Sequence, residues 1–251
     1  MNIALVTGAS SGFGEAICRR LIHDGYKVIG CARRFDKLYQ LQQQLGEYFL
    51  PLLLDMTQQE TIACLLDHIP ESFQPIEILI NNAGLALGLD AAYQTNFNDW
   101  QTMIETNILG LVHLTHLILP IMVKRNQGYI INIGSTAGTY AYKGGNVYGA
   151  SKAFVKQFSL NLRTDLAGKR IRVTNIEPGL CGGTEFSTVR FHGDKAKADK
   201  VYDGIEYITA ADIANTVSWL LSLPAHININ SLEMMPVSQT PAGLNVTKID
   251  R

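Results

Sequence analysis

Three side chains have the types and spacing needed for proton transfer at an alcohol or a carbonyl. Tyr148 and Lys152 stand four residues apart, so on a helix they share one face and lie one turn apart. A free tyrosine has a pKa of about 10, and a nearby ammonium group lowers it by favouring the phenolate. Tyr148 is therefore predicted to act as a general acid and base. Ser135, which follows an apolar run, is predicted to hold the same substrate oxygen.

A glycine-rich turn near the N-terminus supplies the context that the tyrosine and lysine lack by themselves. The apolar run Ile3–Thr7 leads into Gly8, Gly12 and Gly14, and a helical pattern follows. Glycines in this position allow a tight turn, a close approach of phosphate to the backbone, and close packing of helix on strand. The helix N-terminus then offers free N–H groups to a pyrophosphate. The pattern predicts a dinucleotide site, and a bound nicotinamide cation would help Lys152 to lower the Tyr148 pKa.

The end of the second apolar run predicts which dinucleotide is used. NAD-preferring sites place Asp or Glu there to bind the ribose hydroxyls. This chain instead has Arg33 and Arg34, and no carboxylate occurs before Asp36. Two guanidinium groups suit a 2′-phosphate, so NADP(H) is the predicted cofactor. The alternative is that both arginines only face solvent.

Apolar runs alternate with amphipathic segments along the whole chain. The runs are rich in Val, Ile and Leu with little polar alternation, as expected of strands buried on both faces. This order predicts an α/β fold: a single Rossmann-type, doubly wound domain over residues 1–251, with a seven-stranded parallel sheet and helices on both faces. The expected strands are Ile3–Thr7, Tyr26–Cys31, Phe49–Leu54, Ile76–Asn81, Gly128–Ile133, Ile171–Ile176 and Asn228–Met234. The expected helices are Gly14–His23, Asp36–Leu45, Gln58–His68, Asp99–Met122, Tyr148–Leu166 and Ala211–Leu221.

One segment interrupts the alternation. Residues 180–204 are polar, contain several glycines and follow a strand. Long insertions of this kind are often active-site lids, and a lid is predicted here, with a plain surface loop as the alternative.

Composition limits the classes of partner. Lys and Arg number 21 and Asp and Glu 22, which gives a net charge of −1. No overall positive field exists to attract nucleic acid or an anionic membrane, so neither partner is expected. No signal peptide is expected, because the first residues lack a basic region and their apolar run is short, and no stretch is expected to reach the ~20 apolar residues of a membrane span. The four cysteines show no metal-ligand spacing and are expected to be reduced and small buried hydrophobes, so no metal is predicted and the location is expected to be cytoplasmic.

With these motifs the chain resembles the short-chain dehydrogenase/reductase family over essentially its whole length. The Thr7–Gly14 turn, the Asn81–Gly84 segment and the Ser–Tyr–Lys set all correspond to family motifs. The resemblance implies that Asn107 completes a catalytic set with Ser135, Tyr148 and Lys152 by keeping a water for a proton relay. It also implies a homotetramer built partly on two long helices. The cofactor-binding residues implied by these motifs are Gly8, Ser10, Ser11, Gly12, Phe13, Gly14, Arg33, Arg34, Asp55, Met56, Asn82, Ala83, Gly84, Tyr148, Lys152, Pro178, Gly179, Thr184 and Phe186.

Residues 133–138, 144–150, 178–186 and 230–237 further resemble the branch of the family that acts on small 3-hydroxy acids. That likeness implies oxidation of L-allo-threonine, serine and 3-hydroxyisobutyrate, and reduction of malonic semialdehyde. Ser135 and Asn146 are expected at the substrate. Its carboxylate needs a cation or N–H groups, for which Arg190 is the first candidate and Lys143 with the Gly144–Gly145 amides the others. Ser151 and Cys181 are not expected to alter the reaction.

Two other functions remain open from the residues. The same catalytic set could reduce a 3-ketoacyl thioester or a xenobiotic carbonyl. The chain could also be a non-catalytic NADP(H)-sensing protein, although sensors of this kind tend to lose the tyrosine or the lysine, and both are present here.

Overall fold

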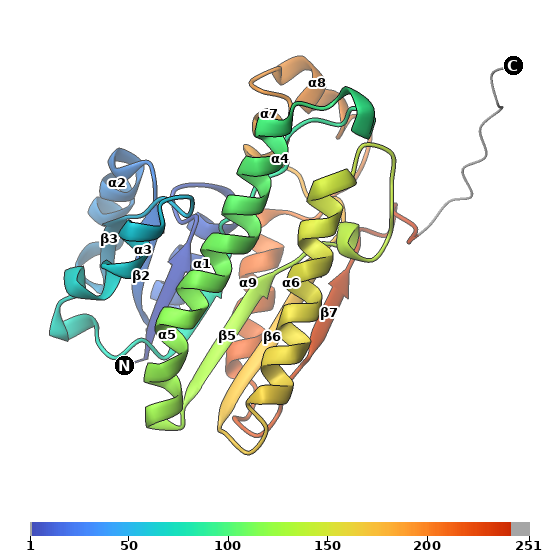
Figure 1. The fold of residues 1–251 in the computed structure, drawn as a ribbon. Helices are drawn as coiled ribbons and strands as arrows, with labels where there is room; N and C mark the ends of the chain where they lie inside the picture. Colours follow the sequence, from blue (N-terminus) through green and yellow to red (C-terminus); the bar gives the residue numbers. More distant parts are fainter. Residues whose placement is uncertain (1, 242–251) are drawn as a thin grey trace, which may run out of the picture.

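Seven parallel strands form one twisted sheet at the centre of the molecule (Figure 1). The computed structural model describes residues 2–241, so Met1 and residues 242–251 of the predicted domain lie outside the described residues. The strand order is β3-β2-β1-β4-β5-β6-β7, which confirms the predicted doubly wound, Rossmann-type α/β class. The strands are β1 (Ile3–Thr7), β2 (Lys27–Ala32), β3 (Phe49–Leu53), β4 (Ile78–Asn81), β5 (Gly128–Ile133), β6 (Ile171–Pro178) and β7 (Ser231–Met234).

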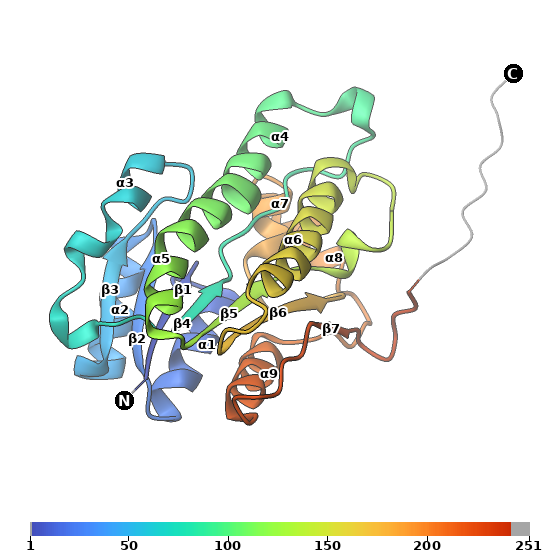
Figure 2. The same ribbon diagram turned by 60° about the horizontal axis from the view of Figure 1, so that its bottom comes forward.

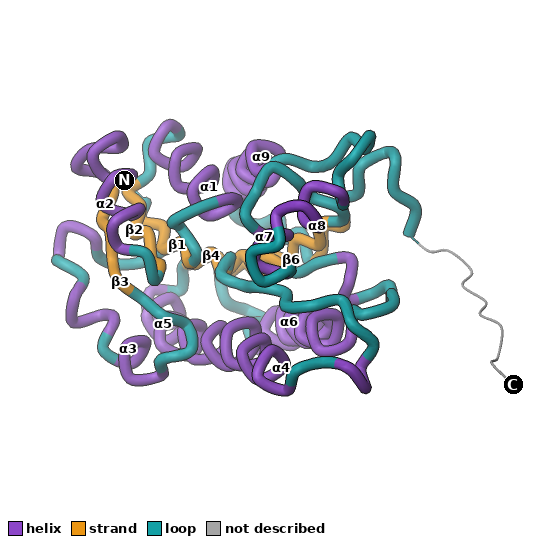
Figure 3. Tube along the Cα trace, turned by 90° about the horizontal axis from the view of Figure 1, so that it is seen from above, coloured by secondary structure: helices purple, strands orange, loops and turns teal. Residues whose placement is uncertain are grey.

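Helices cover both faces of this sheet, as Figure 3 shows in a view of the molecule from above. One face carries α1 (Gly12–His23), α2 (Phe35–Leu45) and α9 (Ala210–Ser222). The other face carries α3 (Gln59–Ala63), α4 (Phe97–Ile104), α5 (Leu111–Arg125) and α6 (Asn146–Asp165). The short helices α7 (Phe186–Arg190) and α8 (Lys195–Lys200) lie near the carboxyl end of β6.

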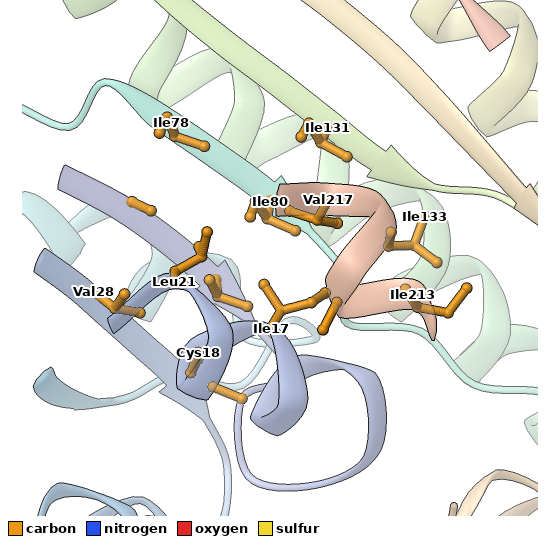
Figure 4. Close-up of a cluster of buried hydrophobic side chains, with 14 of the residues drawn as sticks. Ile17, Cys18, Leu21, Val28, Ile78, Ile80, Ile131, Ile133, Ile213 and Val217 are labelled. Atoms are coloured by element: carbon orange, nitrogen blue, oxygen red, sulfur yellow. The ribbon is translucent and has the colours of Figure 1, made fainter. Parts of the chain in front are cut away.

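Two hydrophobic cores result, one on each face, because successive strand residues point to opposite sides. In β1, Ala4 and Val6 pack under α1 and α9, whereas Ile3 and Leu5 pack on the opposite side. Figure 4 shows the first of these cores, where Ile17 and Leu21 of α1 meet Val217 of α9 above the strands. The matching core on the other face includes Ile62, Leu114, Ile118, Met122 and Leu162.

The last strand, β7, is shorter than the sequence predicts. At its predicted start, the side chain of Asn228 makes the hydrogen bonds to β6 that a strand backbone would make. The Asn228 amide accepts from the backbone N–H of Val173 over 2.7 Å and donates to the Val173 carbonyl over 3.0 Å. Regular pairing of β6 with β7 begins only at Asn175 and Ser231, and it continues to Pro178. This pairing extends β6 two residues beyond its predicted end at Ile176.

The longest predicted helix, Asp99–Met122, is observed as three parts in one continuous run. A π-helical segment, Glu105–Gly110, joins α4 to α5. Gly110 lies here against the backbone of Met56, whose carbonyl oxygen would be only 2.3 Å from a Cβ at this position. Wider helical turns of this kind are frequent at functional sites.

The run from Phe97 to Arg125 is long and apolar enough, by length and composition, to cross a membrane, which corrects the expectation that no stretch reaches that size. Its apolar residues Leu114, Ile118 and Met122 lie in the core against the sheet. Packing of a long helix in the protein interior accounts for this composition without a membrane. Figure 2 shows α5 lying along the sheet beside α6.

Residues 180–204, predicted as a lid, contain the helices α7 and α8 and border the carboxyl ends of the strands. The cysteine expectation holds for Cys18 and Cys31, which are buried, but Cys64 is exposed and Cys181 is half-buried.

Candidate active site

A cleft of about 890 Å³ opens at the carboxyl ends of the strands. It extends across the point between β1 and β4 where the winding of the chain reverses, the usual ligand site of this architecture. Its walls come from the glycine turn, the ends of β2 to β6, the start of α6 and the segment 180–204.

Ser135, Tyr148 and Lys152 all line this cleft, as the sequence predicts. Tyr148 and Lys152 lie on the same face of α6, and the Lys152 ammonium nitrogen is 5.9 Å from the centroid of the Tyr148 ring. Lys152 donates a hydrogen bond to the carbonyl oxygen of Ile133 over 2.7 Å. Ser135 follows β5, and its hydroxyl is fixed by a hydrogen bond from the Ala137 N–H over 3.1 Å.

Burial dominates the proton affinities of this set. It raises the pKa of Tyr148 to about 12, while hydrogen bonding by Ser135 and the charge of Arg190 oppose that rise. Burial also lowers the pKa of Lys152 to about 8, because it disfavours the ammonium form. The protein's own groups thus keep Tyr148 as a neutral phenol at neutral pH, so the depressed tyrosine pKa expected from the sequence is not produced by Lys152 alone.

Asn107 lies behind the cleft wall, in the π-helical segment. Its side-chain amide donates to the carbonyl of Leu85 over 2.9 Å and to the hydroxyl of Ser151 over 3.0 Å, and its oxygen accepts from the Leu85 N–H. A Cβ on Gly84 would lie 3.3 Å from both the Asn107 oxygen and the Lys152 nitrogen, so these two groups meet at a glycine. Sequence reasoning gave Ser151 no role, since only the fold reveals this contact.

The glycine turn has the geometry that a pyrophosphate requires. Gly8 and Gly12 have φ values of +69° and +55°, a region that favours glycine. A Cβ on Gly14 would lie 2.2 Å from the Gly8 carbonyl oxygen, so only glycine permits this packing. Ser11 precedes α1 as its N-cap, and its side chain makes no capping hydrogen bond. The N-terminus of α1 therefore has free N–H groups beside the cleft, which fits a dinucleotide.

Arg33 and Arg34 both line the cleft. Arg34 donates to the hydroxyls of Ser10 and Ser11 and forms an ion pair with Glu185 at 2.7 Å. Lys37 also pairs with Glu185, and its hydrogen bond is the largest cause that lowers the Glu185 pKa to about 2. Glu185 therefore links the segment 180–204 to Arg34 and Lys37, and the sequence alone does not predict these contacts.

Most of the other predicted cofactor residues also line the cleft. Asp55 does so while its carboxylate accepts from the N–H and hydroxyl of Thr57, and Asn82 does so while its amide donates to the Thr7 carbonyl. Gly14 and Asn107 lie outside the wall, buried directly behind it. The remaining predicted residues that line the cleft are Phe13, Met56, Ala83, Gly84, Pro178, Gly179, Thr184 and Phe186.

The predicted substrate-binding residues are divided by the fold. Arg190 lines the cleft, and its guanidinium carbon is 5.2 Å from the centroid of the Tyr148 ring. Asn146 is not in the wall, because its side chain accepts from the Trp100 indole over 3.1 Å and donates to the Asp90 carbonyl. Lys143 and the Gly144–Gly145 amides are also not part of the wall. The fold thus brings only Ser135 and Arg190 of this group to Tyr148.

Known proteins resemble this chain along nearly its whole length. It is 57% identical over 245 residues to a "Probable NADP-dependent dehydrogenase" of Haemophilus influenzae, covering 98% of this chain and 97% of that protein. It is 56% identical to the "NADP-dependent 3-hydroxy acid dehydrogenase YdfG" of Escherichia coli (strain K12), covering 97% and 98%. A solved structure of "The Closed form of serine dehydrogenase complexed with NADP+" superposes with a TM-score of 0.97 at 55% identity, covering 98% of this chain and 100% of that one.

A comparison with models of whole protein families identifies the family. The family model described as "short chain dehydrogenase" matches residues 2–194, which include the glycine turn, the Ser–Tyr–Lys set and Arg190. This agreement confirms the resemblance drawn from the motifs, and the chain belongs to the short-chain dehydrogenase family.

Proposed function

We propose that this chain is an NADP-dependent oxidoreductase that transfers a hydride between NADP(H) and C3 of small 3-hydroxy acids or 3-oxo acids. The substrates are of the type of L-allo-threonine, serine, 3-hydroxyisobutyrate and malonic semialdehyde. The observation that carries the proposal is the meeting of Ser135, Tyr148 and Lys152 with the guanidinium of Arg190 in one cleft. The relatives described above, named for NADP and for 3-hydroxy acid or serine dehydrogenation, support it.

Proton transfer is the part of the reaction that the protein performs. The nicotinamide, when bound, accepts the hydride from C3 of the alcohol or returns it to the carbonyl. In the oxidation, Tyr148 receives the hydroxyl proton of the substrate as the C–H electron pair leaves; in the reduction it gives this proton back. Ser135 holds the reacting oxygen beside the phenol. Lys152 carries the positive charge that favours the phenolate, and Asn107 supports the water that relays the proton.

Arg33 and Arg34 provide the basis for a preference for NADP(H) over NAD(H). Arg33 lines the cleft at the end of β2, and Arg34 stands beside the Ser10 and Ser11 hydroxyls at the glycine turn. Guanidinium groups and hydroxyls together form the donor set that a 2′-phosphate prefers. No carboxylate of β2 competes for the ribose hydroxyls, because this strand ends at Ala32 and the next acidic residue is Asp36.

Arg190 supports an acidic substrate. The guanidinium lies over three aromatic rings, and within residues 2–241 it forms no ion pair. A partly buried cation without a carboxylate partner is costly unless a ligand supplies the anion. A 3-hydroxy acid bound with C3 near Tyr148 carries its carboxylate two bonds away, within the reach of this group.

We further propose a cytoplasmic homotetramer without nucleic-acid or membrane partners. The helix α4, the π-helical segment after it and the helix α6 expose apolar side chains, namely those of Ile104, Leu109, Phe154 and Leu160. Trp219 of α9 is also 46% exposed. Apolar surfaces of this kind mark association sites. Light scattering after gel filtration tests the assembly, and a mass of one chain would contradict it.

A substrate panel tests the enzymatic proposal directly. Purified protein is mixed with NADP and each small 3-hydroxy acid, and the absorbance of the reduced nicotinamide is followed. Separate arms use NADPH with a 3-ketoacyl thioester and with a xenobiotic ketone. Turnover of the acids above the other classes is expected. Preference for the thioester or the ketone would overturn the substrate class, and cofactor binding without turnover of any compound would indicate a sensor.

A further inference from the structure

One hydrogen bond in the cleft fixes the direction of the Arg190 side chain. Its terminal NH₂ nitrogen donates to the hydroxyl of Tyr142 over 2.5 Å. The backbone of Arg190 is held separately, since its carbonyl accepts from the Gly88 N–H over 2.8 Å. The guanidinium carbon lies 5.2 Å from the ring centroid of Tyr148, 5.6 Å from that of Phe186 and 5.7 Å from that of Tyr142.

The Arg190 side chain keeps an unused donor at this place. Its Nε atom is shielded from solvent and has no hydrogen-bond partner in the described part of the chain. A buried donor on a charged group costs free energy until an acceptor reaches it. A carboxylate bound beside the guanidinium would satisfy this donor, which the hydrogen bond to Tyr142 keeps in place.

Tyr142 is itself held in place by the backbone before α6. Its ring packs on Gly145, where an added Cβ would lie 2.8 Å from a ring carbon, and its carbonyl accepts from the Gly145 N–H over 3.0 Å. Tyr142 comes from the segment between β5 and α6, whereas Arg190 comes from α7 in the segment 180–204. The pair thus spans the cleft beside the catalytic tyrosine.

We propose that Tyr142 orients Arg190 toward the substrate carboxylate and thereby sets the preference for acids over neutral hydroxy compounds. The inference rests on the proposed function and adds to it a residue that determines specificity. Tyr142 is a positioning residue, because it acts mainly through Arg190. Its loss should weaken binding of the acid group and leave the proton transfer at Tyr148 intact.

The test compares an acid with its neutral counterpart. Initial rates with NADP are measured for 3-hydroxypropionate and 3-hydroxypropanamide in the wild type, in Tyr142→Phe and in Tyr140→Phe. The Tyr140 hydroxyl donates to the Glu233 carboxylate, whereas the Tyr142 hydroxyl accepts from Arg190, so Tyr140→Phe is a matched loss of one phenol hydroxyl. Where the amide is not oxidised, its inhibition constant against the acid replaces its KM.

Tyr142→Phe should lower kcat/KM for the acid by about 10-fold or more, through KM, since a hydrogen bond to a charged group is stronger than one between neutral groups. The value for the amide should change less than about two-fold, and Tyr140→Phe should leave the acid preference unchanged. In an Arg190→Gln background, Tyr142→Phe should have no further effect on the acid, as expected for coupled residues.

Equal losses for acid and amide would overturn the inference, as would additive effects of the two substitutions. If the wild type oxidises the acid and Tyr142→Phe still prefers the acid to the amide to the same extent, the role of Tyr142 is refuted while the proposed function stands. A wild-type enzyme that oxidises neither the acid nor any other 3-hydroxy acid would refute the proposed function instead.

Discussion

The side-chain amide of Asn107 donates a hydrogen bond over 3.0 Å to the hydroxyl of Ser151, the residue that precedes Lys152 on α6. Ser151 is completely buried and donates in turn to the Tyr148 carbonyl over 2.7 Å. The hydroxyl therefore joins the π-helical segment to the helix that carries Tyr148 and Lys152.

Ser151→Ala should lower kcat by about 2- to 10-fold, since one oriented hydrogen bond contributes about 0.5–1.5 kcal/mol. The KM for cofactor should change little, because the glycine turn and the arginines are untouched. Ser159→Ala is the control, since the Ser159 hydroxyl accepts from the buried amide of Asn132 over 2.8 Å and donates to the Val155 carbonyl, and none of these three residues lines the cleft. Ser159→Ala is expected to lower the stability and leave kcat unchanged. The same result for Ser151→Ala would contradict the role of Ser151 in positioning Asn107.

The Tyr148 phenol should remain protonated in enzyme stripped of cofactor. Burial raises its pKa to about 12, so absorbance titration of the wild type and of Tyr148→Phe should coincide up to about pH 10. An additional ionisation near neutral pH in the wild type alone would show that the protein by itself stabilises the phenolate, contrary to this account.

Lys152 should make the stability of the protein depend on pH. Its pKa is about 8 in the folded chain and 10.5 for the ordinary side chain, so the unfolded chain binds this proton more tightly. Stability must then rise with pH through this window. Relative to Lys152→Met, the free energy of unfolding of the wild type should increase by about 2 kcal/mol between about pH 8 and pH 9.5. Urea denaturation at the two pH values measures this difference, and a constant difference would contradict the burial of the ammonium group.

Cofactor preference should depend on Arg33. Replacing Arg33 with Ala should lower kcat/KM for NADPH by about 10- to 100-fold, the range expected for a lost contact to a phosphate, and should leave the value for NADH nearly unchanged. Arg19→Ala serves as the control, because Arg19 pairs with Glu15 on α1 outside the main cleft. Wild-type turnover with NADH equal to or better than with NADPH would refute the assignment of NADP(H).

Much of the fold follows from local pattern. The apolar runs predict all seven strands because a parallel sheet buried on both faces requires continuous Val, Ile and Leu. Their ends were less predictable: Asn228 substitutes for backbone with its side chain, and Gly110 packs on the Met56 backbone within a π-helical segment. Both effects depend on residues distant in sequence, which a local pattern does not record.

The site divides in the same way. Gly8, Gly14, Tyr148 and Lys152 were recognisable because their spacing within one turn or one helix carries the chemistry. Ser151, Tyr142 and Glu185 were not, because each acts on a partner at least 40 residues away, as the contacts of Ser151 with Asn107 and of Tyr142 with Arg190 show. Asn146 was expected at the substrate, yet its side chain holds Trp100.

The central claim is that the phenol of Tyr148 carries the proton of the reaction, and steady-state turnover of Tyr148→Phe tests it most directly. This variant keeps the ring and its packing on Phe186, where the ring centroids are 5.9 Å apart, and removes only the hydroxyl. We predict that kcat falls at least ~100-fold while NADPH still binds, as for the loss of a general acid. A kcat within a few-fold of the wild type, with cofactor binding intact, would contradict the account.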